Sequence, residues 1–251
     1  RELAYSANHD ATTGLPNRGA LFSRAKHAVR RAVRRETPVA VLFCDLDGFK
    51  QLNDQFGHGA GDDLLTAFGA RLLESCRASD TVARIGGDEF AVLLEDDVTE
   101  ESLAAVAQRI VTAAATPFDI PAGQVAVTAS VGAVLAQVTP EVVDAAQEVE
   151  NLIDRADVAM YHAKSLGKNR WSRFNEALER TMTRRGDAHA DIEAGAEAGQ
   201  FHVHYQPQFG RCGELVGAEA LLRWHDPQRG VVDMSEVIAE LGGIPAGVAD
   251  T

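Results

Sequence analysis

Acidic side chains stand at two places in the sequence where a metal ion could be held. Asp45 and Asp47 follow an apolar run, and Asp88 and Glu89 follow a pair of glycines. Mg²⁺ and Mn²⁺ prefer a few carboxylate oxygens completed by substrate phosphates, so these residues would suit a nucleoside triphosphate if the fold brought them together. The alternative for Asp88 and Glu89 is a solvated hairpin tip, because glycine turns commonly carry acidic residues.

The segments around these carboxylates predict alternating strands and helices. The apolar run 39–44 is typical of a strand covered on both faces, and residues 81–85 and 89–94 predict a hairpin around Gly86-Gly87. Apolar periodicity predicts helices over 20–35, 100–115 and 149–164, a further helix between a glycine-rich break at 57–61 and Cys76, and strands over 125–135 and 171–174. The fold class expected is an α/β (α+β) sandwich, with a mixed sheet and helices on its faces.

The same pattern predicts the domain organisation. We expect residues 1–9 to be the end of an upstream connector helix and residues 10–174 to form the first domain. Residues 175–199 are charged and rich in alanine, which predicts a linker helix. A second α/β domain begins with a strand at 201–206, and residues 200–251 hold only its N-terminal part.

Composition narrows the class of protein. The 251 residues carry a formal net charge of −13, which argues against a general nucleic-acid surface, so a phosphorylated ligand would need a metal ion or local cations. Three cysteines without a C-x-x-C pattern predict neither a disulfide framework nor a zinc site, which fits a reducing, cytoplasmic setting. The sequence has no apolar run of about 18 residues, so we expect no membrane segment within this chain.

Five motifs in order resemble the GGDEF-domain diguanylate cyclases over residues 10–174. They are Asp10–Arg18, in which Thr12 replaces the usual leucine; Asp45–Lys50 with Asn53-Asp54; Gly57-His58 with Gly61-Asp62; Arg84–Phe90; and Ala163–Asn169. The resemblance implies a nucleotide-cyclase-like fold. It also implies condensation of two GTP molecules into cyclic di-GMP with release of two pyrophosphates.

In that family the catalytic residues correspond here to Asp45, Asp88 and Glu89. The resemblance implies that Asp45 and Asp88 hold Mg²⁺ or Mn²⁺ with the main-chain carbonyl of Leu46, while Glu89 assists a second metal or the attacking hydroxyl. Each domain would hold one GTP, so activity would require a homodimer.

The resemblance also implies which residues bind substrate. Asn53 and Asp62 would read guanine, and Gly87, Lys50, Lys164 and Lys168 would contact the nucleotide, the lysines at its triphosphate. From the residues alone, Asp62 could instead be a helix N-cap and Asn53 an ordinary turn residue. Lys164 and Lys168 could simply complement a helix dipole.

Arg77 and Asp80 resemble the R-x-x-D site at which cyclic di-GMP binds and inhibits these enzymes. On spacing alone the pair would be a surface salt bridge of little energetic value. A rival function is a non-catalytic cyclic di-GMP receptor that binds through this pair, against which the intact Asp88-Glu89 argues. A third is an adenylate-type cyclase that turns over ATP.

The second domain resembles the start of an EAL domain, the phosphodiesterase partner of this family. The matching segments are Tyr205–Gln208 and Gly217–Trp224, and Glu219 would be the first metal ligand. The other ligand positions of the family do not occur before Thr251, so we expect no hydrolysis by this chain, and residues 242–248 depart from the family pattern, which indicates truncation or a frameshift. His202 and His204 alternate on the expected strand, but without a third ligand they do not predict a metal site.

Overall fold

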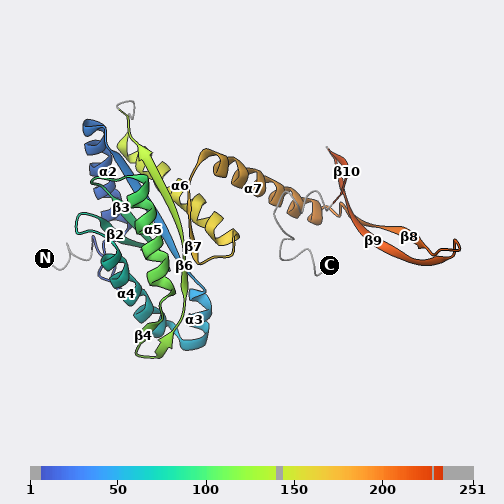
Figure 1. Ribbon diagram of the computed structural model, residues 1–251, viewed down its shortest axis with the longest axis horizontal. Coiled ribbons are helices and arrows are strands. Elements are labelled where there is room, and N and C mark those ends of the chain that lie inside the picture. Colours follow the sequence, from blue (N-terminus) through green and yellow to red (C-terminus); the bar gives the residue numbers. More distant parts are fainter. Residues whose placement is uncertain (1–6, 140–143, 228, 234–251) are drawn as a thin grey trace. The chain divides into compact units, whose positions relative to one another are not determined.

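The computed structural model describes residues 7–139, 144–227 and 229–233 (Figure 1). The chain divides into two compact units, Arg1–Glu179 and Arg180–Thr251. Each unit is described by itself below. Among the described residues, no helix combines the length and the apolar character needed to cross a bilayer.

A five-stranded sheet forms the centre of the first unit, in the order β2-β3-β1-β6-β7. The strands are β1 (Pro38–Asp47), β2 (Thr81–Gly86), β3 (Glu89–Leu94), β6 (Thr128–Gln137) and β7 (Arg170–Arg173). β1 is antiparallel to both β3 and β6, while β6 and β7 are parallel. The sheet is therefore mixed, which confirms the predicted fold class.

Helices cover both faces of this sheet. α4 (His58–Ser75) and α5 (Glu100–Ala115) lie side by side on one face, and α2 (Arg18–Arg35) and α6 (Ala145–Ser165) pack on the other (Figure 1). The short helix α3 (Phe49–Phe56) directly follows β1, and a small hairpin, β4 (Phe118–Ile120) with β5 (Gly123–Val125), precedes β6. Because β1 is central and covered on both sides, its apolar run is buried along its length.

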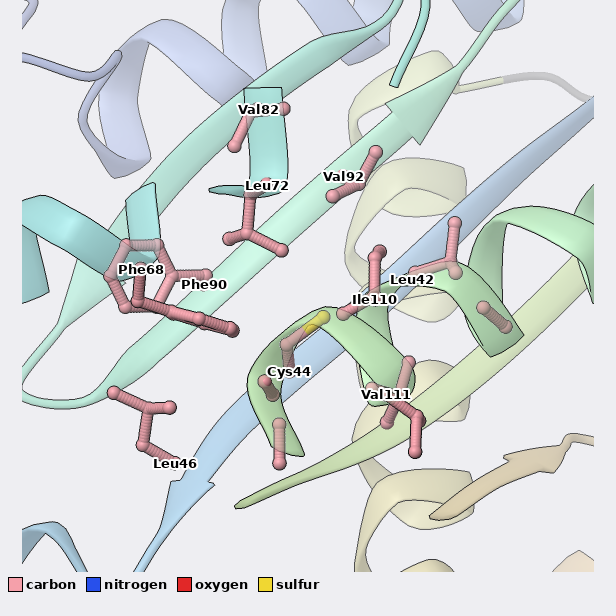
Figure 2. Close-up of a cluster of buried hydrophobic side chains, with 14 of the residues drawn as sticks. Leu42, Cys44, Leu46, Phe68, Leu72, Val82, Phe90, Val92, Ile110 and Val111 are labelled. Carbon is pink, nitrogen blue, oxygen red and sulfur yellow. The ribbon is translucent and has the colours of Figure 1, made fainter. Parts of the chain in front are cut away.

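Alternate residues of β1 supply the two cores. Leu42, Cys44 and Leu46 point toward α4 and α5, where Phe68 meets Phe90 edge to face with ring centroids 5.0 Å apart (Figure 2). Val39, Val41 and Phe43 point toward α2 and α6. Each fully buried side chain of this size contributes about 1.5–3 kcal/mol of transfer free energy, so β1 is fixed firmly from both sides. Its C-terminal end, which carries the acidic residues, is correspondingly well placed.

The predicted elements are present, and three differences from the prediction stand out. Residues 58–61, expected as a break, are the first turn of α4, although Gly59 and Gly61 disfavour a helix. The helix α3 was missed because its eight residues, about two turns of helix, have little periodicity to detect. The predicted strand 125–135 begins later, at Thr128, since the chain first forms the β4–β5 hairpin.

The second unit contains a three-stranded antiparallel sheet in the order β10-β9-β8. Its strands are β8 (Phe201–Phe209), β9 (Leu215–Asp226) and β10 (Gly230–Asp233), and the helix α7 (Glu176–Glu197) occupies the segment predicted as a linker helix. Ile192 and Trp224 form its small core, and the Trp224 indole donates to the Gln200 side chain at 3.0 Å. Of the expected connector helix 1–9, residues 7–9 form a turn and a β-bridge from His9 to Pro16 instead, and residues 1–6 lie outside the described residues, as does the tail 242–248.

Candidate active site

Adjacent strands bring Asp45 and Glu89 together. The two residues are direct partners in the β1–β3 register, at the end of β1 and the start of β3. Asp45 is only 13% exposed, and its Oδ1 lies 2.8 Å from the Nζ of Lys164, which reaches it from the last turn of α6. The sheet and α6 thus place two of the predicted catalytic carboxylates and one predicted phosphate ligand at one site.

The turn between β2 and β3 carries Gly87 and Asp88 beside this pair. Gly87 has a φ of 50°, a left-handed conformation that glycine adopts at little cost. The backbone amide of Leu46 donates to the carbonyl of Asp88 at 3.4 Å, which ties the turn to β1. Asp88 is therefore held beside Leu46, the residue after Asp45, which is the proximity that the metal assignment predicts.

Arg84 holds this turn in place through hydrogen bonds to its backbone. Its Nε and Nη2 donate to the carbonyl of Gly87 at 3.0 and 2.7 Å, and its Nη1 lies 2.9 Å from Asp10 Oδ1. Burial alone would raise the pKa of Asp10, but hydrogen bonds from Arg84 and Thr13 hold that pKa below its ordinary value. Asp10 therefore stays ionised and keeps the guanidinium in place, a role that the sequence did not reveal.

The site concentrates negative charge. Desolvation raises the pKa of Asp45, and it raises the pKa of Glu89 too, where repulsion from Asp157, Asp45 and Asp88 adds to the effect. The pKa of Asp157 on α6 is raised as well, chiefly by desolvation. Asp157 was missed by sequence reasoning, although it lies seven residues before Lys164 and hence near the same helix face. Lys164 opposes the charge of all three carboxylates.

These oxygens fit a hard divalent cation. An ammonium group already lies against Asp45, which shows that the position attracts positive charge, and carboxylate and carbonyl oxygens are the ligands Mg²⁺ prefers. Within the described ranges, no three carboxylate, imidazole or thiol groups converge closely enough to hold a metal by themselves. The ion would therefore take further ligands from backbone carbonyl groups, water and phosphate.

The predicted guanine-reading residues lie on α3 and α4. Asn53 Oδ1 is buried, and among the buried side-chain polar atoms of the described residues it is the one that lacks a hydrogen-bond partner. Gly61 on α4 makes room for it, because a Cβ there would lie 2.0 Å from that oxygen. Asp62 is exposed beside Gly61, and since α4 already begins at His58, the alternative of Asp62 as the N-cap is excluded.

The predicted phosphate-binding lysines come from three segments. Lys50 is exposed on the first turn of α3, Lys164 is paired with Asp45, and Lys168 follows α6 in the segment that leads to β7. Lys168 and Asn169 have φ values of 61° and 47°, which are uncommon for residues other than glycine. Lys50 and Lys168 make no ion pair within the described residues.

Arg77 and Asp80 form a turn after α4. The Asp80 Oδ2 accepts from the backbone amide of Arg77 at 2.7 Å, so this carboxylate stabilises the turn and is not paired with the guanidinium. The Arg77 side chain is exposed, and the structure shows no partner for its guanidinium among the residues it describes. The surface salt bridge considered as an alternative is therefore absent.

Residues of interest in the second unit lie on its sheet. Glu219 is exposed on β9, opposite Gln206 of β8. The rings of His202 and His204 both contact that of His225, with centroids 4.5 and 5.6 Å apart. The described residues show no metal-binding arrangement of these groups, so the three rings form a packed surface cluster.

Comparison with known proteins agrees with these observations. Residues 7–170 match the family described as "Diguanylate cyclase, GGDEF domain", and residues 189–242 match the EAL domain. The GGDEF domain of PA1120 (TpbB or YfiN) from Pseudomonas aeruginosa superposes with a TM-score of 0.63 and 34% identity, covering 70% of this chain and 99% of that one. An EAL/GGDEF domain protein from M. capsulatus is 41% identical over 64% of this chain and 99% of its own, with a TM-score of 0.52.

Longer proteins show the same two-part similarity. The bifunctional diguanylate cyclase/cyclic di-GMP phosphodiesterase MucR of Pseudomonas aeruginosa is 38% identical over 92% of this chain and 33% of its own length. The cyclic di-GMP phosphodiesterase PdeR of Escherichia coli is 35% identical over 94% of this chain and 34% of its own. The chain thus spans about a third of the length of these relatives. It belongs to the GGDEF family of diguanylate cyclase domains, followed by part of an EAL domain.

Proposed function

We propose that the first unit condenses two GTP molecules into cyclic di-GMP and two pyrophosphates. The observation that carries this proposal is the arrangement around Asp45, which pairs with Glu89 across neighbouring strands, lies beside the Asp88 turn and holds the Lys164 ammonium. The residues that would bind metal or act on the hydroxyl lie close to one another there. Family membership supports the reaction class.

The carboxylates would have two different roles in the reaction, metal binding and proton acceptance. Asp45 and Asp88, with the carbonyl of Leu46, would hold Mg²⁺ or Mn²⁺, which supplies neutralisation of the charge on the phosphate and the leaving pyrophosphate. Burial and the acidic neighbours of Glu89 raise its pKa above the ordinary value, which makes it a better proton acceptor than an ordinary carboxylate. Glu89 is thus suited to take the proton of the ribose 3′-hydroxyl as that oxygen attacks the α-phosphorus.

Guanine is the base that suits Asn53 and Asp62. The unpartnered Oδ1 of Asn53 can accept from the N1 or N2 hydrogens of guanine, and the exposed carboxylate of Asp62 can accept another. Adenine lacks these donors at the matching positions. A buried acceptor left unpaired costs about 1–3 kcal/mol, so the pair would select GTP over ATP.

The reaction requires two copies of the domain. One site binds one GTP, so two sites must face each other before a 3′-hydroxyl can reach the other nucleotide, and holding both substrates in place supplies much of the rate enhancement. We therefore propose an active homodimer. Cyclic di-GMP would bind through the exposed Arg77 guanidinium together with Asp80 and restrain the enzyme.

A turnover assay tests this function. The chain is incubated with GTP and Mg²⁺ at high protein concentration, and the products are separated by chromatography. Cyclic di-GMP and pyrophosphate are expected in a 1:2 ratio, with no turnover of ATP. An Asp88→Ala variant should lose the activity while still binding cyclic di-GMP. Product binding without turnover in the unaltered chain would show a receptor instead of an enzyme.

A further inference from the structure

Asp47 lies two residues beyond Asp45 on the same face of β1, but its surroundings are different. Its Oδ1 accepts from the Ser130 hydroxyl at 2.8 Å, and its Oδ2 accepts from the Thr128 hydroxyl at 2.7 Å and from the backbone amide of Asn169 at 3.2 Å. Ser130 is fully buried. Both oxygens of this carboxylate are therefore engaged, and the three donors come from β6 and from the segment before β7.

The segment that Asp47 holds has an unfavourable backbone. Gly167, Lys168 and Asn169 follow one another with φ values of 107°, 61° and 47°. Glycine and asparagine tolerate left-handed conformations, but a lysine does not adopt one without support from its surroundings. Local hydrogen bonds close the end of α6, from Gly167 to Lys164 and from Lys168 to Ala163. The amide of Asn169 reaches outside the segment, to Asp47.

Two carboxylates of β1 thus hold the two ends of one segment. Asp45 contacts the side chain of Lys164 at its start, and Asp47 contacts the backbone of Asn169 at its end. The Asp45–Lys164 ion pair must break if Lys164 is to bind a phosphate. The hydrogen bond from the Asn169 backbone to Asp47 involves no side chain that is proposed to bind substrate, so it can remain. We infer that Asp47 is a positioning residue, which fixes the segment 164–169 so that Lys164 and Lys168 face the triphosphate.

The inference rests on the proposed nucleotide site, and it competes with the other role that the sequence offers for Asp47. An acidic residue so close to Asp45 could be a metal ligand, but three of the roughly four lone-pair sites of this carboxylate already accept hydrogen bonds. The two roles respond differently to an amide. In Asp47→Asn the amide oxygen can replace Oδ2, and the amide nitrogen can donate to the Ser130 hydroxyl, which is able to accept. Positioning would survive this change, whereas metal ligation would weaken strongly because the amide carries no negative charge.

Binding measurements with two nucleotides test the inference. α,β-Methylene-GTP carries a triphosphate but cannot react, and GMP carries the same base without the outer phosphates. In the presence of Mg²⁺, Asp47→Ala should weaken α,β-methylene-GTP about ten- to hundredfold, as loss of a supporting contact commonly does. GMP affinity should stay unchanged, and Asp47→Asn should bind both nucleotides within about threefold of the unaltered chain. Asp154→Ala, at an exposed aspartate of α6, is the matched control.

Three results would overturn the inference. They are tight binding of α,β-methylene-GTP by Asp47→Ala, an equal loss of GMP affinity, and an Asp47→Asn variant as weak as Asp47→Ala. If Asp47→Ala does not fold, a Thr128→Val, Ser130→Ala double variant removes two donors and keeps the carboxylate. It should show a loss of about threefold to tenfold for the triphosphate alone, and unaltered affinity would count against the inference. If the unaltered chain forms no cyclic di-GMP, the proposed function is wrong. The affinity ratios between the variants can still be measured, because they do not depend on turnover.

Discussion

The two sides of the candidate site are held by different kinds of interaction. On the β3 side of β1, the Gly87-Asp88 turn is fastened by the guanidinium of Arg84, itself paired with Asp10. On the β6 side, α6 approaches the sheet so closely that Gly132 has no room for a side chain. On the β3 side, which carries the proposed metal ligands, the backbone is held by a charged side chain. On the β6 side, which carries the proposed phosphate-binding lysines, it is held by close packing and by hydrogen bonds. The two sides should therefore fail under different perturbations.

The largest effect is expected from Gly132→Ala. A Cβ at this position would lie 1.9 Å from the carbonyl oxygen of Ala156 and 2.2 Å from the amide nitrogen of Met160, both backbone atoms that cannot turn away. Moving α6 would lower the free energy of unfolding by about 3 kcal/mol and displace Lys164. Denaturant unfolding measures the first effect and nucleotide binding the second.

Gly59→Ala is the matched control for this substitution. Gly59 lies in α4 with open space around its Cα, so alanine should be neutral or slightly stabilising there. Equal stability of the Gly132→Ala and Gly59→Ala variants would refute the close approach of α6 to the sheet.

Arg84→Ala breaks the charged side of the comparison. The Arg84 side chain is 11% exposed, so its loss leaves the Gly87 carbonyl without its side-chain donors and Asp10 with only the hydrogen bonds from Thr13. We expect the free energy of unfolding to fall by about 2 kcal/mol. Turnover should fall at least tenfold, because Asp88 lies in the turn that Arg84 no longer holds in place. Arg84→Lys keeps the positive charge but not the two parallel N–H donors of the guanidinium, so it should recover only part of the turnover. Full turnover in Arg84→Ala would show that the turn holds its shape unaided.

Gly61→Ala sharpens the assignment of the base site. Its Cβ would meet Asn53 Oδ1 at 2.0 Å and would force that side chain to move. Because Asn53 is expected to accept from guanine, the preference for GTP over ATP should fall about tenfold, which corresponds to roughly 1.4 kcal/mol. Competition binding with the two nucleotides measures the ratio. An unchanged ratio would remove Asn53 from the proposed recognition site.

The smallest effect concerns pH. Burial and carboxylate repulsion raise the pKa of Glu89 in the folded chain above its ordinary value of 4.5, so the folded state binds more protons than the unfolded one between these two values. This contribution to stability is present below pH 4.5 and is lost as the pH rises through the raised pKa. Metal-free Glu89→Gln should therefore show a flatter fall in stability above pH 4.5. If the free energy of unfolding falls with pH equally steeply in Glu89→Gln and in the unaltered chain, the pKa of Glu89 is not raised by its carboxylate neighbours.

Local sequence patterns predicted the strands, most helices and the position of the acidic residues. β1 follows from its apolar run, and the hairpin follows from the glycines that precede Asp88. The contacts that organise the site could not be predicted in this way, because their partners are remote in sequence: Arg84 and Asp10 are separated by 74 positions, and Asp47 and Asn169 by 122. Gly61 was taken for a break because its role depends on the neighbouring helix α3.

The hydrogen bond between Asp47 and Asn169 has a consequence for the order of folding. It spans 122 positions, and α6 lies between the paired strands β6 and β7 in the sequence. Contacts of such long sequence separation carry a large loop-closure cost and form late. During synthesis the hairpin bearing Asp88 would be complete while Lys168 had yet to be made. The triphosphate contacts proposed for Lys164 and Lys168 therefore become available only after nearly the whole domain has been synthesised.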